Sequence, residues 1–121
     1  LTYCNLRCTY CDTEYAFYEG IDYTFEQILS EIKKYDCNLV EITGGEPLVQ
    51  KEVISLMQTL CDEGYQVMIE TGGSLPIQEI DQRVKIIMDL KYTEKLLMAS
   101  LQQLHLLRDR ELRLRRMNTA L

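Results

Sequence analysis

Short apolar runs rich in β-branched residues alternate with amphipathic stretches along the first 90 residues of the chain. The strand-like runs fall at 39–43, 66–70 and 84–90, and the helical patterns fall at about 25–35 and 51–63. Such alternation is typical of parallel strands joined by crossover helices. The sequence therefore predicts an α/β fold whose ligands gather at the carboxyl ends of the strands.

The helical patterns carry recognisable start and stop signals. Thr24 followed by Gln27 has the spacing of a capping box, and Gly64 follows the second pattern as a plausible C-cap. From residue 94 onward leucines recur at helical spacing, and arginines surround them as far as Arg116. This pattern predicts one long terminal helix.

Polar residues and glycines follow each predicted strand. The three segments are Thr43-Gly44-Gly45-Glu46, Glu70-Thr71-Gly72 and Asp89-Leu90-Lys91. Because the carboxyl ends of parallel strands meet at one edge of a sheet, we expect these segments to share a binding site.

Composition limits the classes of function. The chain has 121 residues and a formal net charge of −6, so it is expected to be a single domain that does not bind nucleic acid, whose phosphates require Lys and Arg. No apolar run approaches the roughly 20 residues that span a bilayer, and no leader sequence is evident. A cytoplasmic protein without a membrane partner is the expectation.

Three of the five cysteines lie within eight positions, as Cys4, Cys8 and Cys11 in a Cys-x3-Cys-x2-Cys loop. A disulfide framework rarely crowds cysteines in this way, which favours metal binding in a reducing compartment. Full protein ligation of a cuboidal iron–sulfur cluster uses four thiolates. A loop that offers only three thiolates therefore leaves one iron of the cluster open to a small molecule.

A zinc site is the alternative that the spacing leaves open. Its fourth ligand would be Cys37, Cys61 or His105. Without further motifs, Cys37 and Cys61 are interpreted as packing residues and His105 as a surface residue of the terminal helix.

The segment Cys4-Asn-Leu-Arg-Cys-Thr-Tyr-Cys-Asp-Thr13, followed by Thr43-Gly-Gly-Glu-Pro47, resembles the radical S-adenosylmethionine (SAM) superfamily. The continuation Cys11-Asp-Thr-Glu-Tyr-Ala-Phe17 and Gly20 resemble the 7-carboxy-7-deazaguanine synthase family within it. The resemblance covers about residues 1–91. It implies an incomplete parallel (β/α) partial barrel of radical SAM type that lacks its first strand, followed by an unmatched Leu/Arg-rich tail over 92–121.

The resemblance also implies roles for individual residues. A [4Fe–4S] cluster would be ligated by Cys4, Cys8 and Cys11. The residues expected at SAM are Tyr10, Cys11, Asp12, Gly45, Glu46, Asp89, Leu90 and Lys91. Thr13 would give its hydroxyl to Mg²⁺, and Thr43 would contact the substrate. Outside this motif, Thr13 and the glycines would be ordinary turn residues.

The implied activity is that of a carbon–nitrogen lyase of queuosine (7-deazapurine) biosynthesis, which converts 6-carboxy-5,6,7,8-tetrahydropterin to 7-carboxy-7-deazaguanine. Its cofactors would be the cluster, SAM and Mg²⁺. Its partners would be the pterin, an electron donor such as flavodoxin or ferredoxin, and a second copy of the chain in a homodimer.

Two other functions remain open at this stage. One is an activase that forms a glycyl radical on a partner protein, which shares the cysteine spacing. The other is a non-catalytic iron–sulfur or zinc-binding module. Because an amino-terminal segment of the family's pterin site is not present in the chain, we expect SAM cleavage without pterin turnover.

Overall fold

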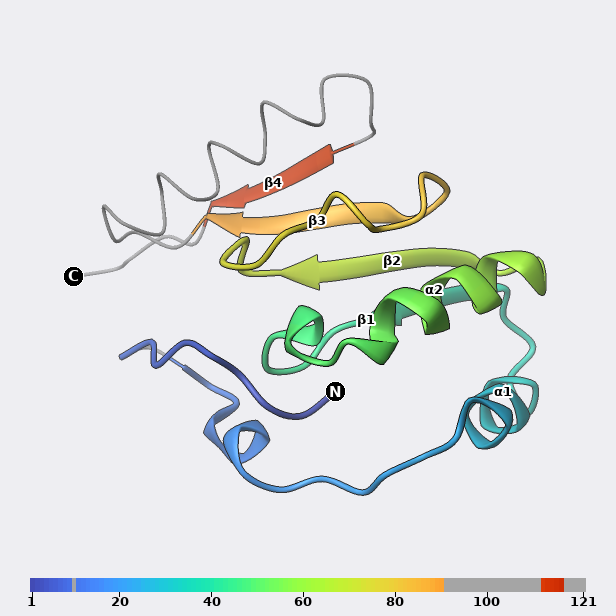
Figure 1. Cartoon of the computed structure of the whole chain (residues 1–121), viewed down its shortest axis with the longest axis horizontal. Helices are drawn as coiled ribbons and strands as arrows, with labels where there is room; N and C mark the ends of the chain where they lie inside the picture. The colour runs from blue at the N-terminus through green and yellow to red at the C-terminus, as the bar shows by residue number, and fades with distance from the viewer. Residues whose placement is uncertain (10, 91–111, 117–121) are drawn as a thin grey trace.

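A computed structural model of the chain describes residues 1–9, 11–90 and 112–116 (Figure 1). Four strands form one parallel sheet in the order β1-β2-β3-β4. The strands are β1 (Leu39–Ile42), β2 (Gln66–Thr71), β3 (Lys85–Leu90) and β4 (Leu112–Arg116). The helices are α1 (Phe25–Ile32) and α2 (Glu52–Asp62), with short 3₁₀ helices η1 (Glu14–Phe17) and η2 (Pro47–Val49). The α/β architecture predicted from the sequence is confirmed.

The local signals at the helix ends are also confirmed. The Thr24 hydroxyl accepts a hydrogen bond from the Gln27 backbone N–H, and the Gln27 side chain accepts one from the Thr24 N–H, which completes the capping box. Gly64 follows α2 with a φ of +91°, a left-handed conformation that favours glycine. These contacts fix where α1 begins and where α2 ends.

The prediction of a continuous terminal helix is wrong for Leu112–Arg116. These residues form β4, which pairs in parallel with β3 from Ile86 to Leu90. In this stretch Leu and Arg alternate with the period of a strand. Pairing with β4 gives the backbone groups at the open edge of β3 their hydrogen bonds. This gain outweighs the helical tendency that the spacing of the preceding leucines indicates. The rest of the predicted helix, over 94–111, lies outside the described residues.

The core lies between α2 and the sheet. Met57, Leu60, Ile69 and Met88 are fully shielded from solvent. The same cluster of buried residues also contains Ile42, Val53, Leu56, Val67, Ile77, Ile80, Val84 and Ile86. Helix α2 follows β1 and precedes β2 in the chain. The parallel pairing of β1 with β2 sets the carboxyl ends of these two strands side by side (Figure 1).

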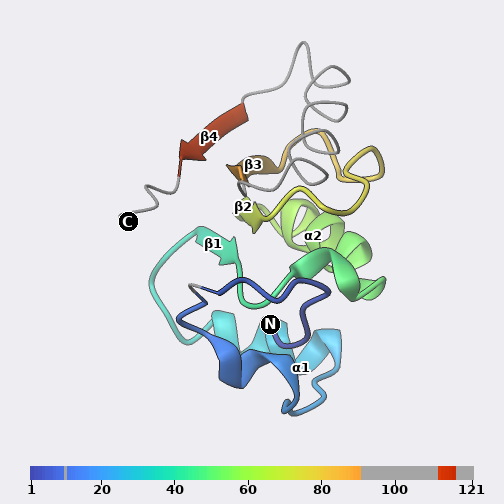
Figure 2. The same cartoon turned by 90° about the vertical axis from the view of Figure 1, so that its left-hand side faces the viewer.

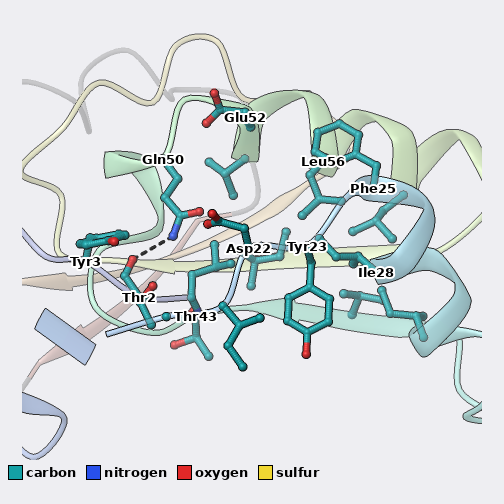
Figure 3. A pocket seen from close by; sticks show the side chains of 18 of the residues that line it. Thr2, Tyr3, Asp22, Tyr23, Phe25, Ile28, Thr43, Gln50, Glu52 and Leu56 are labelled. Carbon is teal, nitrogen blue, oxygen red and sulfur yellow. Dashed lines mark hydrogen bonds between the residues drawn. The ribbon is translucent and has the colours of Figure 1, made fainter. Parts of the chain in front are cut away.

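Helix α1 lies on the other side of β1 from β2 (Figures 1 and 2). It buries none of its residues fully, whereas α2 buries four. A groove of about 760 Å³ separates α1 from α2, and its wall includes Phe25, Ile28 and Leu56 (Figure 3). In the described part of the chain, β1 is the edge strand on this side of the sheet.

Among the residues that the structure describes, no helix combines the length and the apolar character needed to cross a membrane.

We expect Ile69→Ala to lower the free energy of unfolding by about 2–5 kcal/mol, because it leaves a cavity in the fully buried centre of β2. Denaturant unfolding measures this change. Ile21→Ala is the matched control: its side chain is 80% exposed, so the expected change is within about 0.5 kcal/mol. Equal effects for the two variants would contradict the packing described.

Candidate functional site

A cavity of about 430 Å³ lies at the carboxyl ends of β1, β2 and β3. Its wall brings together most of the residues singled out from the sequence. These are Cys4, Cys8, Cys11, Asp12, Thr13, Thr43, Gly45, Glu46 and Asp89. Leu6, Tyr15, Phe17, Gly44, Glu70, Thr71 and Gly72 complete it. The geometry agrees with the expectation that the three strand ends share one site, and the cysteine loop lies at the same cavity.

The amino-terminal segment reaches this edge of the sheet by docking its backbone on the glycine turn after β1. The Gly45 N–H donates to the Leu1 carbonyl at 3.1 Å, and the Glu46 N–H donates to the Tyr3 carbonyl at 2.9 Å. Figures 1 and 2 show the segment passing the end of the sheet to which the strands point. These two bonds place Cys4 beside the carboxyl end of β1.

The close approach requires glycine at two positions. A Cβ at Gly45 would overlap the Tyr3 carbonyl oxygen and lie 3.0 Å from Cys4 Cβ. Gly44 has a φ of +138°, and a Cβ there would overlap the Leu1 carbonyl. We expected SAM to approach the Gly45 backbone where the side chain is missing. Tyr3 and Cys4 of the cysteine segment occupy that space instead. Gly45 still lines the cavity, and its contact with SAM stays a prediction.

Tyr3 is the only described residue other than glycine with a positive φ, at +67°. Such a conformation is costly for a bulky residue and persists only where its surroundings hold it. The Tyr3 N–H donates to the Ala16 carbonyl at 2.6 Å, while the neighbouring Thr2 carbonyl accepts from Gln50 Nε2 at 2.9 Å (Figure 3). The chain therefore turns sharply just before the first cysteine.

The three cysteines of the loop are free and half-buried. The Leu6 N–H points at Cys4 Sγ at 3.4 Å, and the Cys11 N–H donates to the Cys8 carbonyl at 3.2 Å. Within the part of the chain that the structure describes, no three Cys, His, Asp or Glu side chains form a group that would hold one metal ion. A zinc ion needs its ligands about 2.0–2.3 Å from one point, whereas thiols spread around a cavity suit a larger cluster.

The other two cysteines give no support to a zinc site. Cys61 packs against the core from α2, and its partial burial raises the pKa of the thiol. Cys37 was expected to pack but is exposed, because it lies in the loop between α1 and β1. His105 lies outside the described residues.

Hydroxyl groups and carboxylates occupy the rest of the wall. Thr13 Oγ1 donates to Asp12 Oδ1 at 2.9 Å, and Cys11 Sγ lies 4.0 Å from the same hydroxyl. Thr43 Oγ1 donates to Glu70 Oε2 at 3.2 Å, which links the ends of β1 and β2. Oxygen atoms therefore share the cavity wall with the thiols, and oxygen ligands are those that Mg²⁺ prefers.

Glu46 is buried, with 1% of its surface exposed, although acidic side chains are rarely so deep unless paired. Its Oε1 accepts from Thr71 Oγ1 at 2.8 Å and from the Leu48 N–H at 3.2 Å. Its Oε2 accepts from the Gly72 N–H at 2.8 Å. Glu46 thus ties the turn after β1 to the turn after β2. Sequence reasoning missed this role; an acidic residue between a glycine pair and a proline was the available signal.

Of the four remaining residues predicted to contact SAM, the structure describes two. Asp89 lines the cavity from β3, and Leu90 is the last residue of that strand. Tyr10 and Lys91 lie outside the described residues. The roles assigned to all four stay predictions.

Comparison with known proteins places this site in a family context. The model of the radical SAM superfamily matches residues 1–118 and so extends beyond residue 91, where the resemblance seen in the sequence ended. The 7-carboxy-7-deazaguanine synthase of Chlorobaculum tepidum is 43% identical over 88 residues, which are 73% of this chain and 40% of that protein. That of Koribacter versatilis is 46% identical over 93 residues, covering 75% and 41%.

One solved structure supports the fold. The crystal structure of QueE from Escherichia coli has a TM-score of 0.71 and 19% sequence identity, and the match covers 97% of this chain and 73% of that one. The chain spans about 40% of the length of the curated relatives described above.

We expect Glu46→Gln to lower the free energy of unfolding by about 1–3 kcal/mol, because an amide NH₂ would face a backbone N–H or a hydroxyl donor in a buried position. Thermal or denaturant unfolding measures the change. Glu41→Gln, on the exposed face of β1, is the control and should shift stability by no more than about 0.5 kcal/mol. If Glu46→Gln left the free energy of unfolding unchanged, the carboxylate would not hold the two turns together.

Proposed function

Because the chain belongs to the radical SAM superfamily, we propose that the cavity at the strand ends holds a [4Fe–4S] cluster on Cys4, Cys8 and Cys11, with SAM beside it. The observation that carries the proposal is the convergence of the three thiols and the carboxyl ends of β1, β2 and β3 on one cavity. The superfamily implies both cofactors.

The donor set fits these groups. Thiolates are the soft ligands that iron–sulfur clusters require, and three of them leave one iron for SAM. The cavity of about 430 Å³ lies within the range of small-molecule sites. Acidic Asp12 and Asp89 on its wall match the amino group of SAM in charge, and their carboxylates can accept hydrogen bonds from its amino and ribose groups.

The chemistry that a cluster held by Cys4, Cys8 and Cys11 would supply is the one-electron reductive cleavage of SAM. The residues of the chain bind, orient and shield the reactants. Asp12 presents a carboxylate oxygen next to the thiols, where it would bind a cationic group of SAM. The Thr43 hydroxyl, which is oriented by Glu70, would position the substrate in the same cavity.

Thr13 is proposed as a ligand of Mg²⁺. Its hydroxyl lies beside the Asp12 carboxylate and close to Cys11, so a cation bound there would adjoin the cluster. Mg²⁺ keeps several coordination positions for water and substrate, and it would anchor the substrate carboxylate.

The proposed reaction of the whole protein is the conversion of 6-carboxy-5,6,7,8-tetrahydropterin to 7-carboxy-7-deazaguanine in queuosine biosynthesis. Its support is the identity of 43% and 46% with two proteins of that name. We further propose a flavodoxin or ferredoxin as electron donor, a homodimer, and a cytoplasmic location, where a reducing medium keeps the thiols free.

The test is anaerobic incubation of the reconstituted chain with dithionite, SAM, Mg²⁺ and the carboxy-tetrahydropterin. Because the chain spans about 40% of its relatives, we expect 5′-deoxyadenosine and methionine but no deazaguanine product. A Cys8→Ser chain, which lacks one cluster ligand, is the control and should cleave no SAM.

Three outcomes would contradict the proposal. Reconstitution that yields zinc alone, or a reconstituted chain that leaves SAM intact, would contradict the proposed radical SAM activity. Formation of a glycyl radical on a partner protein, without any turnover of the pterin, would favour the activase instead.

A further inference from the structure

The cysteine loop contains one cation, Arg7, between the first and second cysteines. Its Nη1 donates to the Cys4 carbonyl at 2.8 Å and to the Leu6 carbonyl at 2.7 Å. One nitrogen thus closes the turn that begins at the first thiol. The Leu6 N–H, which points at Cys4 Sγ, lies in the same turn.

The guanidinium of Arg7 also lies over an aromatic ring from outside the loop. Its Cζ is 4.3 Å from the centroid of the Phe17 ring and 5.6 Å from that of Tyr18. These distances are typical of cation–π contacts. The two rings meet edge to face at 5.8 Å, and Phe17 lines the same cavity as the thiols. Arg7 therefore joins the cysteine loop to η1, which follows the third cysteine.

The charge of Arg7 is not neutralised by a carboxylate among the described residues. Three other cations among the described residues differ, because carboxylates neutralise them: Lys33 pairs with Glu63, Lys34 pairs with Glu31, and Arg83 pairs with Asp62 and Asp81. A cluster held by three thiolates is anionic and becomes more so on reduction. An unpaired cation within the ligand loop favours the reduced form, because the attraction grows with the negative charge.

We propose that Arg7 is a positioning residue of the cluster site, which fixes the Cys4 turn against Phe17 and offsets the negative charge of the reduced cluster. This role rests on the cluster assignment of the proposed function. The Arg7 side chain would then have two separable effects. The carbonyl bonds and the ring contact are made together by a rigid, planar guanidinium, which the flexible ammonium of lysine does not reproduce, whereas the electrostatic effect needs only a positive charge.

Arg7→Gln and Arg7→Lys separate the two effects. Each chain is reconstituted anaerobically, and two quantities are measured: the rate of iron release to a chelator and the midpoint potential of the cluster. Arg7→Gln should release iron about 10-fold faster, as expected for loss of a group that orients a metal ligand, and its potential should become more negative. Arg7→Lys should also release iron faster but keep a potential close to that of the wild type.

Two further variants complete the comparison. Phe17→Leu removes the ring and keeps apolar bulk, so it should speed iron release without shifting the potential. Arg83→Gln is the matched control, since it removes an arginine that pairs with Asp62 and Asp81 away from the cavity. It should change neither quantity. Far-UV circular dichroism of each chain verifies that it is folded.

These measurements test the role of Arg7 separately from the assignment of the cluster to the three cysteines, on which that role rests. A wild-type chain that takes up no cluster would overturn both. If the wild type takes up the cluster but Arg7→Gln and Arg83→Gln have the same rate of iron release and the same midpoint potential, only the role of Arg7 would be overturned.

Discussion

The site depends on the contact between the backbone of residues 1–4 and the glycine turn after β1. Two N–H groups of the turn bind two carbonyls of the segment, and the approach is close enough to exclude a Cβ at Gly44 or Gly45. A backbone contact of this kind is independent of the side chains on the segment. It places the first cysteine at the sheet edge, and the loop then carries Cys8 and Cys11 around the cavity.

A second set of contacts holds the turns themselves in place. Buried Glu46 joins the turn after β1 to the turn after β2, while Thr43 and Glu70 link the same two strands at the cavity wall. The glycine pair and the acidic residue that follows it therefore form a frame for the cysteine loop, apart from any contact they make with SAM. Arg7 adds a third contact, between the loop and Phe17.

Much of the fold was predictable because it follows from local rules. The capping box of α1, the strands and the common edge of their carboxyl ends came from periodicity and turn residues. Strand β4 was not predictable, because its leucines suit both a helix and a strand and the open edge of β3 decides between them. The steric need for Gly45 depends on a segment about 40 residues away in the sequence. The side-chain bonds of Glu46 reach residues that are 25 and 26 positions away, and a local pattern reveals neither.

The most direct test of the account is the spectrum of the reconstituted cluster with and without SAM, in the wild type and in Gly45→Ala. The wild type should hold about four irons per chain, and its reduced electron paramagnetic resonance signal should change when SAM is added. Gly45→Ala should lose most of this iron, because its Cβ would displace the Tyr3–Cys4 backbone. Gly64→Ala is the control: its Cβ meets no atom within 4 Å, but its φ of +91° makes the change destabilising at a place away from the site, so it should lower the stability and keep the iron. A Gly45→Ala chain that binds the cluster and SAM as the wild type does would contradict the account.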